Sequence, residues 1–555
     1  MTSTKDDKLL FLPLGGAGEI GMNLNLYGWG QEDNAQWMMV DLGVTFADPG
    51  MPAVDIIMPD PAFIEEYRDD LIALVLTHAH EDHLGAVPYL WPRLKCPIYA
   101  TPFTASVLKR KLREVSWGKD VPIHVIELGG TFSVGPFDLE LVSLTHSIPE
   151  PNALAITTPY GMVLHTGDWK FDPDPVVGDA ADIDRLRELG DAKVLAMVCD
   201  STNVFSPGDS GSEGDLQESL TRIIASCKNR VAVSCFSSNI ARLKTVAEAA
   251  HNNERDVVIS GRSMRNMIEA ARETGYIPED MVFLYEEDAG YLPRDKMLLI
   301  CTGSQGETRA ALSRIASGDH PRVSLDEGDT VIFSSRVIPG NEVSISQLQN
   351  TLSKRGIKII DWQDDFVHVS GHPARDELTQ MYQLVRPQIA IPVHGEARHM
   401  IEHAALAHEC QVKTTVVPQN GSMISITKTG AEIIDLVPSG RLALEGKRLV
   451  PIDGKLIRNR RKALYSGFVV ATVVIDGNAE LFDEPQITDT GLLDEDEIEL
   501  ENAIIDAIAN ALENLPKKDR RDDDAITSAI RIAMRRFYKK EFDKKPVTHI
   551  HLVRV

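Results

Sequence analysis

Four side chains that can bind metal ions lie close together in the chain: His78, His80, Asp82 and His83. They follow the apolar run 71–76, which is short enough to be a buried strand. Because side chains alternate along an extended segment, His78 and His80 can share one ion, while Asp82 and His83 can bind a second. Imidazoles with a carboxylate suit zinc, and manganese or iron are compatible with the same ligands. A chance histidine cluster on a polar loop is the alternative, and the position directly after a buried strand argues against it.

Three further strand-like runs each end in a residue of the same kind, namely His146, Asp168 and His394. Because sites of layered α/β folds form at the carboxyl ends of strands, these residues can converge with the first cluster. The predicted ligands of one ion are His78, His80 and His146. Those of the second ion are Asp82, His83 and His394, with Asp168 as a bridge between the two. Taken singly, each is equally compatible with a strand-end polar residue bonded to backbone.

A glycine-rich segment precedes this cluster. Gly16, Gly18 and Gly21 match the dinucleotide pattern G-x-G-x-x-G, and Asp41 follows at about the distance of 20 residues that the pattern requires. The glycines should open a helix, but residues 22–27 alternate like a strand. We therefore interpret the segment as a hairpin beside the site. Asp41 itself ends a strand-like run and is predicted to orient a metal-bound histidine through its other ring nitrogen.

The composition is that of an ordinary soluble globular protein, with 43% hydrophobic and 25% charged residues. At 555 residues, roughly three or four domains are expected. No apolar run approaches the ~18 residues of a membrane span. The six cysteines form no C-x-x-C pair, which favours a reduced, cytoplasmic protein without membrane contact. The net charge of −25 argues against a surface that coats nucleic acid generally, although a local basic channel remains compatible with it.

The order H-x-H-x-D-H, then His146, then Asp168, resembles the metallo-β-lactamase superfamily. His394 comes so much later that a domain can be inserted before it. Segments 198–203 and 367–373 resemble motifs A and B of the β-CASP nucleic-acid hydrolases, with His394 as motif C. The chain is most similar to the bacterial ribonuclease J family, and the resemblance covers essentially all of it. The other segments that carry it are 14–21, 238–240, 301–307, 336–342 and 392–396.

The resemblance implies an α/β fold: a metallo-β-lactamase αββα sandwich, an inserted α/β β-CASP domain and a small α+β C-terminal domain. The expected boundaries are 1–210 and 366–450 for the metallo-β-lactamase domain, 211–365 for the β-CASP domain, 451–464 for a basic linker and 465–555 for a C-terminal oligomerisation domain. In that last domain the helical spacing predicts that Ile526, Ile530, Met534 and Phe537 are buried together. The basic run is either a solvated linker or a contact for RNA phosphates.

The insert has its own signal for an anionic ligand. Four strand-like runs end in small or polar residues, at 237–239, 261–263, 302–304 and 334–336. Backbone amides and hydroxyls at strand-to-helix turns suit phosphate oxygens. Each of these turns alone is ordinary, but four on one side of a sheet favour an anionic ligand.

The resemblance further implies a metal-dependent ribonuclease that releases 5′-monophosphate products in RNA maturation and mRNA decay. It would be a 5′-to-3′ exonuclease that prefers 5′-monophosphate ends, and also an endonuclease. Two Zn²⁺ per subunit are expected, with Mn²⁺ or Mg²⁺ as alternatives in activity. The implied partners are single-stranded RNA, a homodimer or homotetramer formed through the C-terminal domain, and other RNA-degradation enzymes.

The resemblance also assigns residues. Asp82, Asp200 and His372 are the implied catalytic residues, with Asp200 and His372 as candidates for the general acid that protonates the leaving oxygen. A structural bond that fixes the inserted loop is the alternative for this pair. The implied substrate-binding residues are Ser238, His368, Val369, Ser370, Gly371 and His372. Histidine at motif C goes with RNA rather than DNA among β-CASP proteins, and residue 394 is histidine.

Two other function classes compete. A small-molecule hydrolase that acts on a thioester or lactam would need neither an insert of this size nor the Asp200–His372 pair. A scaffold subunit without metal would have lost ligands, and none of the predicted ligands is missing.

Overall fold

The computed structural model describes residues 7–31, 34–47, 51, 53–338, 340–494 and 497–555. Pro339, which falls in the predicted motif 336–342, lies outside the described residues. The chain divides into two compact units. The first comprises Met1–Thr45 and Met58–Gly440, and the second Phe46–Ile57 and Arg441–Val555. In the part of the chain that the structure describes, no helix is both long and apolar enough to cross a membrane.

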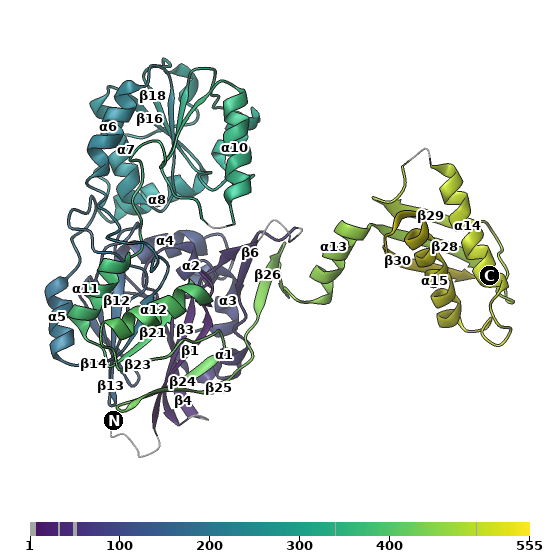
Figure 1. The fold of residues 1–555 in the computed structure, drawn as a ribbon, viewed down its shortest axis with the longest axis horizontal. Helices are drawn as coiled ribbons and strands as arrows, with labels where there is room; N and C mark the ends of the chain where they lie inside the picture. The colour runs from purple at the N-terminus through teal and green to yellow at the C-terminus, as the bar shows by residue number, and fades with distance from the viewer. Residues whose placement is uncertain (1–6, 32–33, 48–50, 52, 339, 495–496) are drawn as a thin grey trace. The chain divides into compact units, whose positions relative to one another are not determined.

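Two large sheets form the base of the first unit (Figure 1). One has the order β25-β24-β1-β3-β4-β7-β8-β9, with bounds Gly430–Leu436, Ser422–Thr427, Lys8–Gly15, Leu24–Gln31, Asn34–Val40, Leu71–Val75, Ile98–Ala100 and Ile123–Val125. The other has the order β10-β11-β12-β13-β14-β21-β23, with bounds Thr131–Val134, Phe137–Ser143, Asn152–Thr158, Gly161–His165, Val194–Asp200, Ile389–Val393 and Thr414–Thr415. A short parallel pair, β2 (Ala17–Gly18) and β22 (Gly395–Glu396), joins the start of the chain to the segment after β21.

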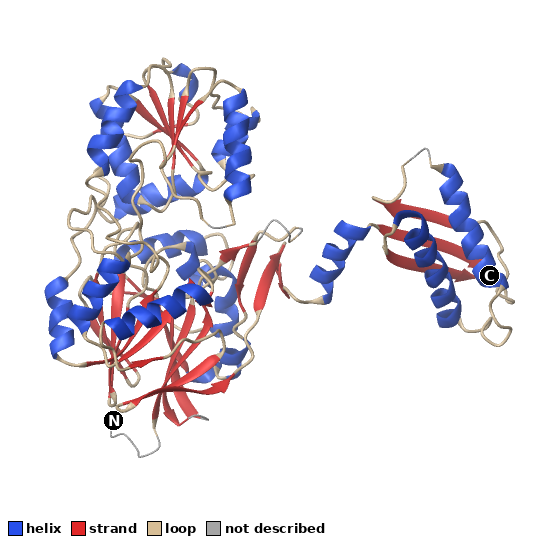
Figure 2. Cartoon of the chain, in the orientation of Figure 1, coloured by secondary structure: helices blue, strands red, loops and turns tan. Residues whose placement is uncertain are grey.

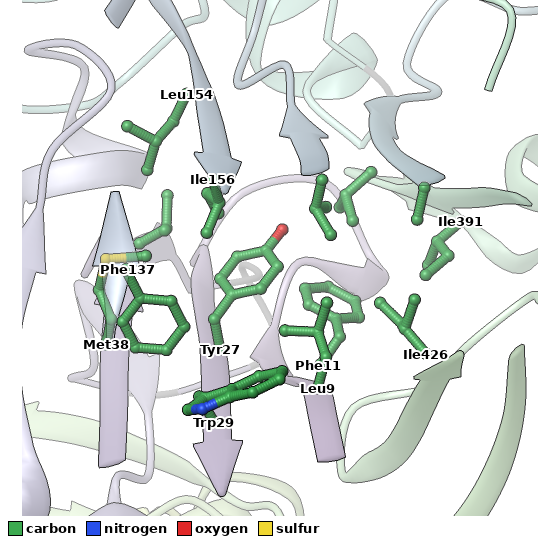
Figure 3. Close-up of a cluster of buried hydrophobic side chains, with 14 of the residues drawn as sticks. Leu9, Phe11, Tyr27, Trp29, Met38, Phe137, Leu154, Ile156, Ile391 and Ile426 are labelled. Atoms are coloured by element: carbon green, nitrogen blue, oxygen red, sulfur yellow. The ribbon is translucent and has the colours of Figure 1, made fainter. Parts of the chain in front are cut away.

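The main hydrophobic core lies between these two sheets. Leu9, Phe11 and Tyr27 from one sheet pack with Phe137 and Ile391 from the other, and all five are buried (Figure 3). The strands are apolar on their inner faces, so pairing the sheets removes both faces from water at once.

Helices cover the outer faces of the pair (Figure 2). Those on the side of the first sheet are α1 (Ala62–Glu66), α2 (Glu81–Leu84), α3 (Val87–Leu94) and α4 (Pro102–Leu112). Those on the second are α5 (Ile183–Asp191), α11 (Arg375–Val385) and α12 (Ala397–Glu409), which share a second core around Trp169, Met381 and Leu406. Single-turn 3-10 helices lie at Arg68–Asp70, Gly118–Asp120 and Ala289–Tyr291.

The insert contains a six-stranded, entirely parallel sheet with helices on both sides (Figure 1). Its order is β17-β16-β18-β15-β19-β20, with bounds Leu284–Tyr285, Asp256–Ser260, Met297–Cys301, Val231–Ser234, Thr330–Phe333 and Lys358–Ile360. The helices are α6 (Leu216–Ser226), α7 (Ile240–Asn252), α8 (Arg262–Glu273), α9 (Ala311–Ser317) and α10 (Glu342–Lys354). Strand and helix alternate along the chain, which is why the sheet is parallel.

The second unit contains a small α+β domain. Its sheet has the order β29-β28-β30, with bounds Gln486–Thr490, Phe468–Ile475 and Val547–Arg554, and α14 (Ile498–Glu513) and α15 (Asp523–Phe542) share its core. The prediction for Phe537 was wrong. Tyr538 is the fully buried residue and Phe537 is only half-buried, because α15 repeats its buried positions at intervals of four: Ile526, Ile530, Met534 and Tyr538.

The remaining elements lie where the chain passes from one unit to the other, near residues 45–59 and 441–466. Helix α13 (Lys455–Ser466) occupies most of the range predicted as a basic linker, and it follows the antiparallel pair β26 (Arg441–Glu445) and β27 (Arg448–Pro451). Two short strands, β5 (Thr45–Phe46) and β6 (Ile56–Pro59), lie earlier in the chain. The predicted fold class, an αββα sandwich with an inserted α/β domain and a small α+β domain, is confirmed.

Candidate metal centre

Six strands deliver the predicted metal ligands, with Asp200 and Asp41, to one edge of the sandwich. Neighbouring parallel strands β13, β14 and β21 end just before Asp168, at Asp200 and just before His394. In the facing sheet, β7 leads to the histidine motif and its parallel neighbour β4 leads to Asp41. His146 follows the end of β11. Parallel pairing brings the carboxyl ends together, so residues far apart in sequence meet in space.

Three histidines form the first group of potential ligands. The Nδ1 atom of His80 lies 3.0 Å from Nε2 of His78 and 3.1 Å from Nε2 of His146. Asp168 Oδ2 lies 4.0 Å from the His78 nitrogen and 3.9 Å from the His146 nitrogen. These four residues can together hold one metal ion.

A second group lies next to the first. His83 Nε2 is 3.1 Å from Asp168 Oδ2 and 3.7 Å from Asp82 Oδ2, and His394 Nε2 is 3.2 Å from the same Asp82 oxygen. Asp82 and His83 lie within the one-turn helix α2, whose N-cap is His80. The turn from strand to helix therefore aims His80 at one group and Asp82 and His83 at the other.

The donor set fits a pair of metal ions. Asp168 belongs to both groups, and its Oδ1 atom is buried without a hydrogen-bond donor among the described residues. A buried carboxylate oxygen with no donor is costly unless a cation compensates for it. Imidazole and carboxylate ligands are those that zinc and related divalent ions prefer.

The protonation states of the first group of histidines suit metal binding, whereas at His83 and His394 burial is outweighed by nearby carboxylates, Asp168 first, which raise the pKa of both rings well above the ordinary histidine value. Burial lowers the pKa of His78 and His146 well below the ordinary histidine value and lowers that of His80 to about 4, so these rings are neutral at pH 7. Burial opposes the charge of Asp82, but the neighbouring His83 and His394 hold the pKa of its carboxyl below the usual range. Neutral imidazoles and ionised carboxylates are the forms that bind metal.

The buried carboxylate of Asp41 contacts the histidine motif through Thr77 and His83. Its Oδ2 lies 2.7 Å from His83 Nδ1 and accepts a hydrogen bond from Thr77 Oγ1, while its Oδ1 accepts one from the Thr77 amide. Asp41 is fully buried and has φ of +64°, a left-handed conformation that costs free energy for a residue with a Cβ. The carboxylate fixes which nitrogen of His83 is left to face the site.

The glycine-rich segment lies against the same site. Gly16 accepts a hydrogen bond from the amide of His394 at 2.7 Å through its carbonyl, and has φ of +82°. A Cβ at Gly16 would lie 2.3 Å from Oδ1 of Asn23, whose amide nitrogen is 3.2 Å from His83 Nε2. A strand, β3, follows these glycines instead of the helix that a dinucleotide fingerprint requires. The segment is therefore packed closely against the predicted metal ligands His83 and His394.

Asp200 and His372 form a pair at the open side of the centre. His372 Nδ1 lies 2.7 Å from Asp200 Oδ2 and 3.9 Å from Asp168 Oδ2. Burial acts to lower the pKa of His372, but Asp200 outweighs burial and the pKa is raised above the ordinary value. Asp200 itself has a lowered pKa, because His372 outweighs the effect of its burial. The pair therefore favours an imidazolium beside a carboxylate.

The loop that contains His372 is held by short polar contacts. Asn203 donates to Ser370 Oγ at 2.6 Å and to the His372 carbonyl at 3.1 Å, and the Ser370 hydroxyl also accepts from the His372 amide. The Gly371 carbonyl contacts His146 Nδ1, and a Cβ at Gly371 would lie 2.9 Å from that ring. The loop therefore touches the predicted metal ligand His146 directly.

The other predicted substrate-binding residues lie farther from the metal ligands. His368 Nδ1 is 3.4 Å from the guanidinium of Arg242, and Val369 packs against Gly211. Ser238 occupies the turn between β15 and α7, and its side chain makes no hydrogen bond to the described residues. The structure places Ser370, Gly371 and His372 beside the centre and His368 and Val369 earlier in the same loop, and it gives no contact between Ser238 and that loop among the described residues.

Sequence reasoning missed several residues that support the site. Thr202 Oγ1 lies 2.8 Å from His394 Nδ1, and Arg242 pairs with Glu213 at 2.9 Å with both side chains buried. Thr202 could have been found as the hydroxyl two residues after Asp200. Arg242 had one weak signal, its spacing of four and seven residues from Val246 and Ala249, which places it on an apolar face of α7.

Four family models match the chain. They are "Metallo-beta-lactamase superfamily" over 31–225, "Ribonuclease J, beta-CASP domain" over 228–352, "Zn-dependent metallo-hydrolase RNA specificity domain" over 364–418 and "Ribonuclease J C-terminal domain" over 455–555. Together they follow the order of the domains described above.

Whole proteins match as well. Ribonuclease J of Sinorhizobium meliloti is 44% identical over 553 residues, which cover 99% of this chain and 98% of the relative. Ribonuclease J 1 of Streptococcus pyogenes is 34% identical and covers 98% and 97%. Among solved structures, a protein of unknown function from Enterococcus faecalis is similar in fold, with a TM-score of 0.52 and 18% identity over 75% of this chain and 100% of that one.

Proposed function

Because the chain belongs to the ribonuclease J family, and is therefore a metal-dependent ribonuclease, we propose that it hydrolyses RNA phosphodiesters at two metal ions to give 5′-monophosphate products. The observation that carries this proposal is the shared Asp168 between two groups of ligands that each fit one ion. We propose Zn²⁺ as the resident ion, held by His78, His80 and His146 on one side and by Asp82, His83 and His394 on the other. When bound, two such ions activate water and screen the charge that develops on the phosphate.

The residues of the chain supply orientation and proton transfer. Asp41 and Thr202 fix the rings of His83 and His394 through the nitrogens that face away from Asp82. His372, held protonated by Asp200, donates a proton to the leaving 3′-oxygen. The alternative for the pair, a purely structural bond, is tested below by a substrate whose leaving group needs no proton.

The loop 368–372 binds the phosphate group at the 5′ end of the RNA in this proposal. Its Ser370 hydroxyl and backbone lie beside the ligand His146 and the acid His372. A 5′-monophosphate bound there places the first phosphodiester at the metals, which accounts for stepwise 5′-to-3′ removal of nucleotides. Internal cleavage occurs when a chain is bound without its end in the loop.

We also propose that copies of the chain associate through the C-terminal domain. Strand β28 alternates between buried and half-buried residues, and the core with α14 and α15 uses only the buried set. The opposite face of the sheet presents Val470 and Val474 beside exposed His549 and His551. A half-apolar sheet face of this kind is typical of a contact between subunits.

A time course on end-labelled single-stranded RNA tests the reaction. Substrates with 5′-monophosphate, 5′-triphosphate and 5′-hydroxyl ends are compared, using the intact chain loaded with zinc or manganese. Mononucleotides should appear first from the 5′-monophosphate substrate, and both chelation and His80→Ala should abolish the products.

Two results would overturn parts of the proposal. Activity that survives His80→Ala would mean that the metal ligands are misassigned. Inert RNA beside turnover of a thioester would move the chain to small-molecule hydrolysis. The metal content of the purified chain, measured by mass spectrometry, should be about two ions per subunit and about one or fewer in His80→Ala.

A further inference from the structure

A cavity of about 590 Å³ lies between α4 of the metallo-β-lactamase domain and α8 of the insert. These helices are tied together, since Arg110 donates to Glu269 and Glu273, and Ser106 donates to Glu273. The cavity lies at the carboxyl ends of β16 and β18, where open parallel sheets commonly bind ligands. Its volume is within the range of ~300–1,000 Å³ that is typical of ligand sites.

The lining of this cavity is basic although the chain as a whole is acidic. Five cationic side chains line it against three acidic ones, in a protein of net charge −25. Two of the cations, Arg262 and Arg314, form no ion pair with the described residues. Of the other three, Arg110 pairs with Glu269 and Glu273, Lys111 pairs with Glu81, and Arg309 also has an interaction partner. Guanidinium groups suit phosphate because their planar donors match two oxygens at once.

The turn between β16 and α8 adds neutral donors to these charges. Gly261 has φ of +127°, and a Cβ there would lie 3.1 Å from the side chain of Thr302, so the backbone approaches the end of β18 closely. Glu286 accepts from Ser260 Oγ and from the Gly261 amide, and therefore already occupies part of this turn. Beyond it, Ser263 and Thr302 contribute hydroxyls to the lining.

We propose that this cavity binds the phosphate group of a nucleotide, at a site separate from the metal centre. The inference rests on the proposed function, because RNA hydrolysis supplies both possible sources, a phosphodiester of the bound strand and a free nucleotide. Among the described residues, no Phe, Tyr or Trp side chain lines the cavity and His320 is its one aromatic ring, so the phosphate rather than a stacked base provides most of the binding free energy. Glu81, which lies between the ligands His80 and Asp82 in sequence, forms part of its wall.

The test compares Arg262→Ala/Arg314→Ala with the wild-type chain. Lys354→Ala, at the exposed end of α10 in the same domain, is the matched control for loss of positive charge. Uridine 5′-monophosphate is titrated calorimetrically into the metal-loaded chain. A 5′-monophosphorylated oligouridylate is bound over a range of salt concentrations, and hydrolysis of a very short oligonucleotide reports the metal centre.

We expect the double variant to weaken phosphate binding about tenfold, with hydrolysis of the short substrate unchanged. If the source is the RNA strand, the slope of log affinity against log salt falls by about 0.7 for each lost contact. If the source is a free nucleotide, the calorimetric affinity falls and the slope stays the same. Either change, absent from Lys354→Ala, supports the site.

Unchanged nucleotide affinity together with an unchanged salt slope would overturn the proposal. That outcome is distinguishable from failure of the proposed function, in which the wild-type chain would not hydrolyse RNA at all. A wild-type chain that is inert on RNA but whose uridine monophosphate affinity depends on Arg262 and Arg314 would retain the cavity and lose the ribonuclease.

Discussion

At the residue scale, neighbouring groups hold most of the predicted ligands in place. Asp168 is shared, and the second ring nitrogen of four histidines has a partner outside the ligand set: Thr77 at His78, Asp41 at His83, Gly371 at His146 and Thr202 at His394. Rigid positioning of this kind lowers the entropy cost of binding an ion. The supporting residues should therefore matter nearly as much as the ligands.

Replacing Asp41 tests this directly. Asp41→Asn keeps the size of the side chain but removes the charge that faces His83 Nδ1, so metal affinity should fall by about 10–100-fold. Competition with a chromogenic chelator measures the affinity. Asp138→Asn, on the exposed side of β11, is the control and should leave it unchanged. Equal affinities for the two variants would contradict a role of Asp41 in orientation.

The role of His372 separates acid catalysis from structure. His372→Ala should lower kcat on RNA by about 10²–10⁴-fold, because the leaving 3′-oxygen then departs without a proton. A nitrophenyl phosphodiester, whose leaving group needs no proton, should lose far less activity, and the metal content should stay at the wild-type level. Equal losses on both substrates would favour the structural alternative for the Asp200–His372 pair.

Some residues of the site could be predicted from sequence and others could not. His146, Asp168 and His394 each end an apolar run, and the rule that strand ends converge is enough to group them. Thr202 follows the end of β14 and meets His394 at the end of the neighbouring strand β21, but Arg242 and its partner Glu213 end no strand, and their contact is set by how the insert folds. Contacts between residues that are distant in sequence cannot be predicted from local sequence patterns.

At the element scale, two segments of the chain connect the insert to the sandwich, one leading out and one returning. A buried ion pair holds these two crossings together, and we call it the clamp. Arg242 on α7 bonds to Glu213 in the outgoing crossing and to the Val367 carbonyl in the returning one. It also donates to Ser334 at the end of β19. One guanidinium therefore fixes the base of the loop that contains His372.

Removing Arg242 should lower the free energy of unfolding by more than the loss of its hydrogen bonds alone. Arg242→Met leaves Glu213 buried without its partner, and unfolding free energy should fall by about 3–5 kcal/mol. Arg222→Met removes an exposed pair with Asp365 and should cost less than about 1 kcal/mol. Chemical denaturation followed by circular dichroism measures both. A loss at Arg242 no larger than that at Arg222 would show that the clamp does not stabilise the insert.

A second buried ion pair, next to Glu213, makes the stability of the protein depend on pH. Lys170 lies 2.8 Å from Asp172, which also accepts from Ser212 and Glu213, and both charges are buried. Burial raises the pKa of Asp172, but Lys170 outweighs it and the pKa is lowered. The stability that this group contributes is therefore complete above its unfolded pKa of about 3.9 and is lost as pH falls through the lower folded value.

Asp172→Asn should consequently be less stable than wild type near neutral pH, and the difference should shrink below about pH 4. Denaturant midpoints measured across this range test the expectation. A difference that is constant with pH would mean that the carboxylate charge does not contribute.

The helices of the C-terminal domain show a limit of pattern reading within one element. Spacings of three and four residues both return to the same side of a helix, so Phe537 and Tyr538 are each compatible with the stripe through Met534. Packing against β28 and α14 selects Tyr538, and sequence periodicity alone does not distinguish them.

At the scale of the whole molecule, an acidic protein must bind an acidic polymer. The net charge of −25 repels RNA at long range, so affinity depends on the local cations and metal ions of the first unit. Association of several copies would supply more than one such surface for a single RNA. In the proposed oligomer, several such surfaces would therefore act on the same RNA.

The open face of the C-terminal sheet is where that association should be disrupted. Val470→Lys places a charge in the middle of the face, and a buried charge without a partner opposes contact between subunits. The sedimentation coefficient should fall to that of a smaller species, while circular dichroism remains that of a folded chain. Ile532→Lys, on an exposed position of α15, introduces the same charge on a helix and should leave the assembly intact. If Val470→Lys sediments as the wild-type chain does, the subunits associate through another surface. If both variants dissociate, the contact between subunits extends over the helices as well.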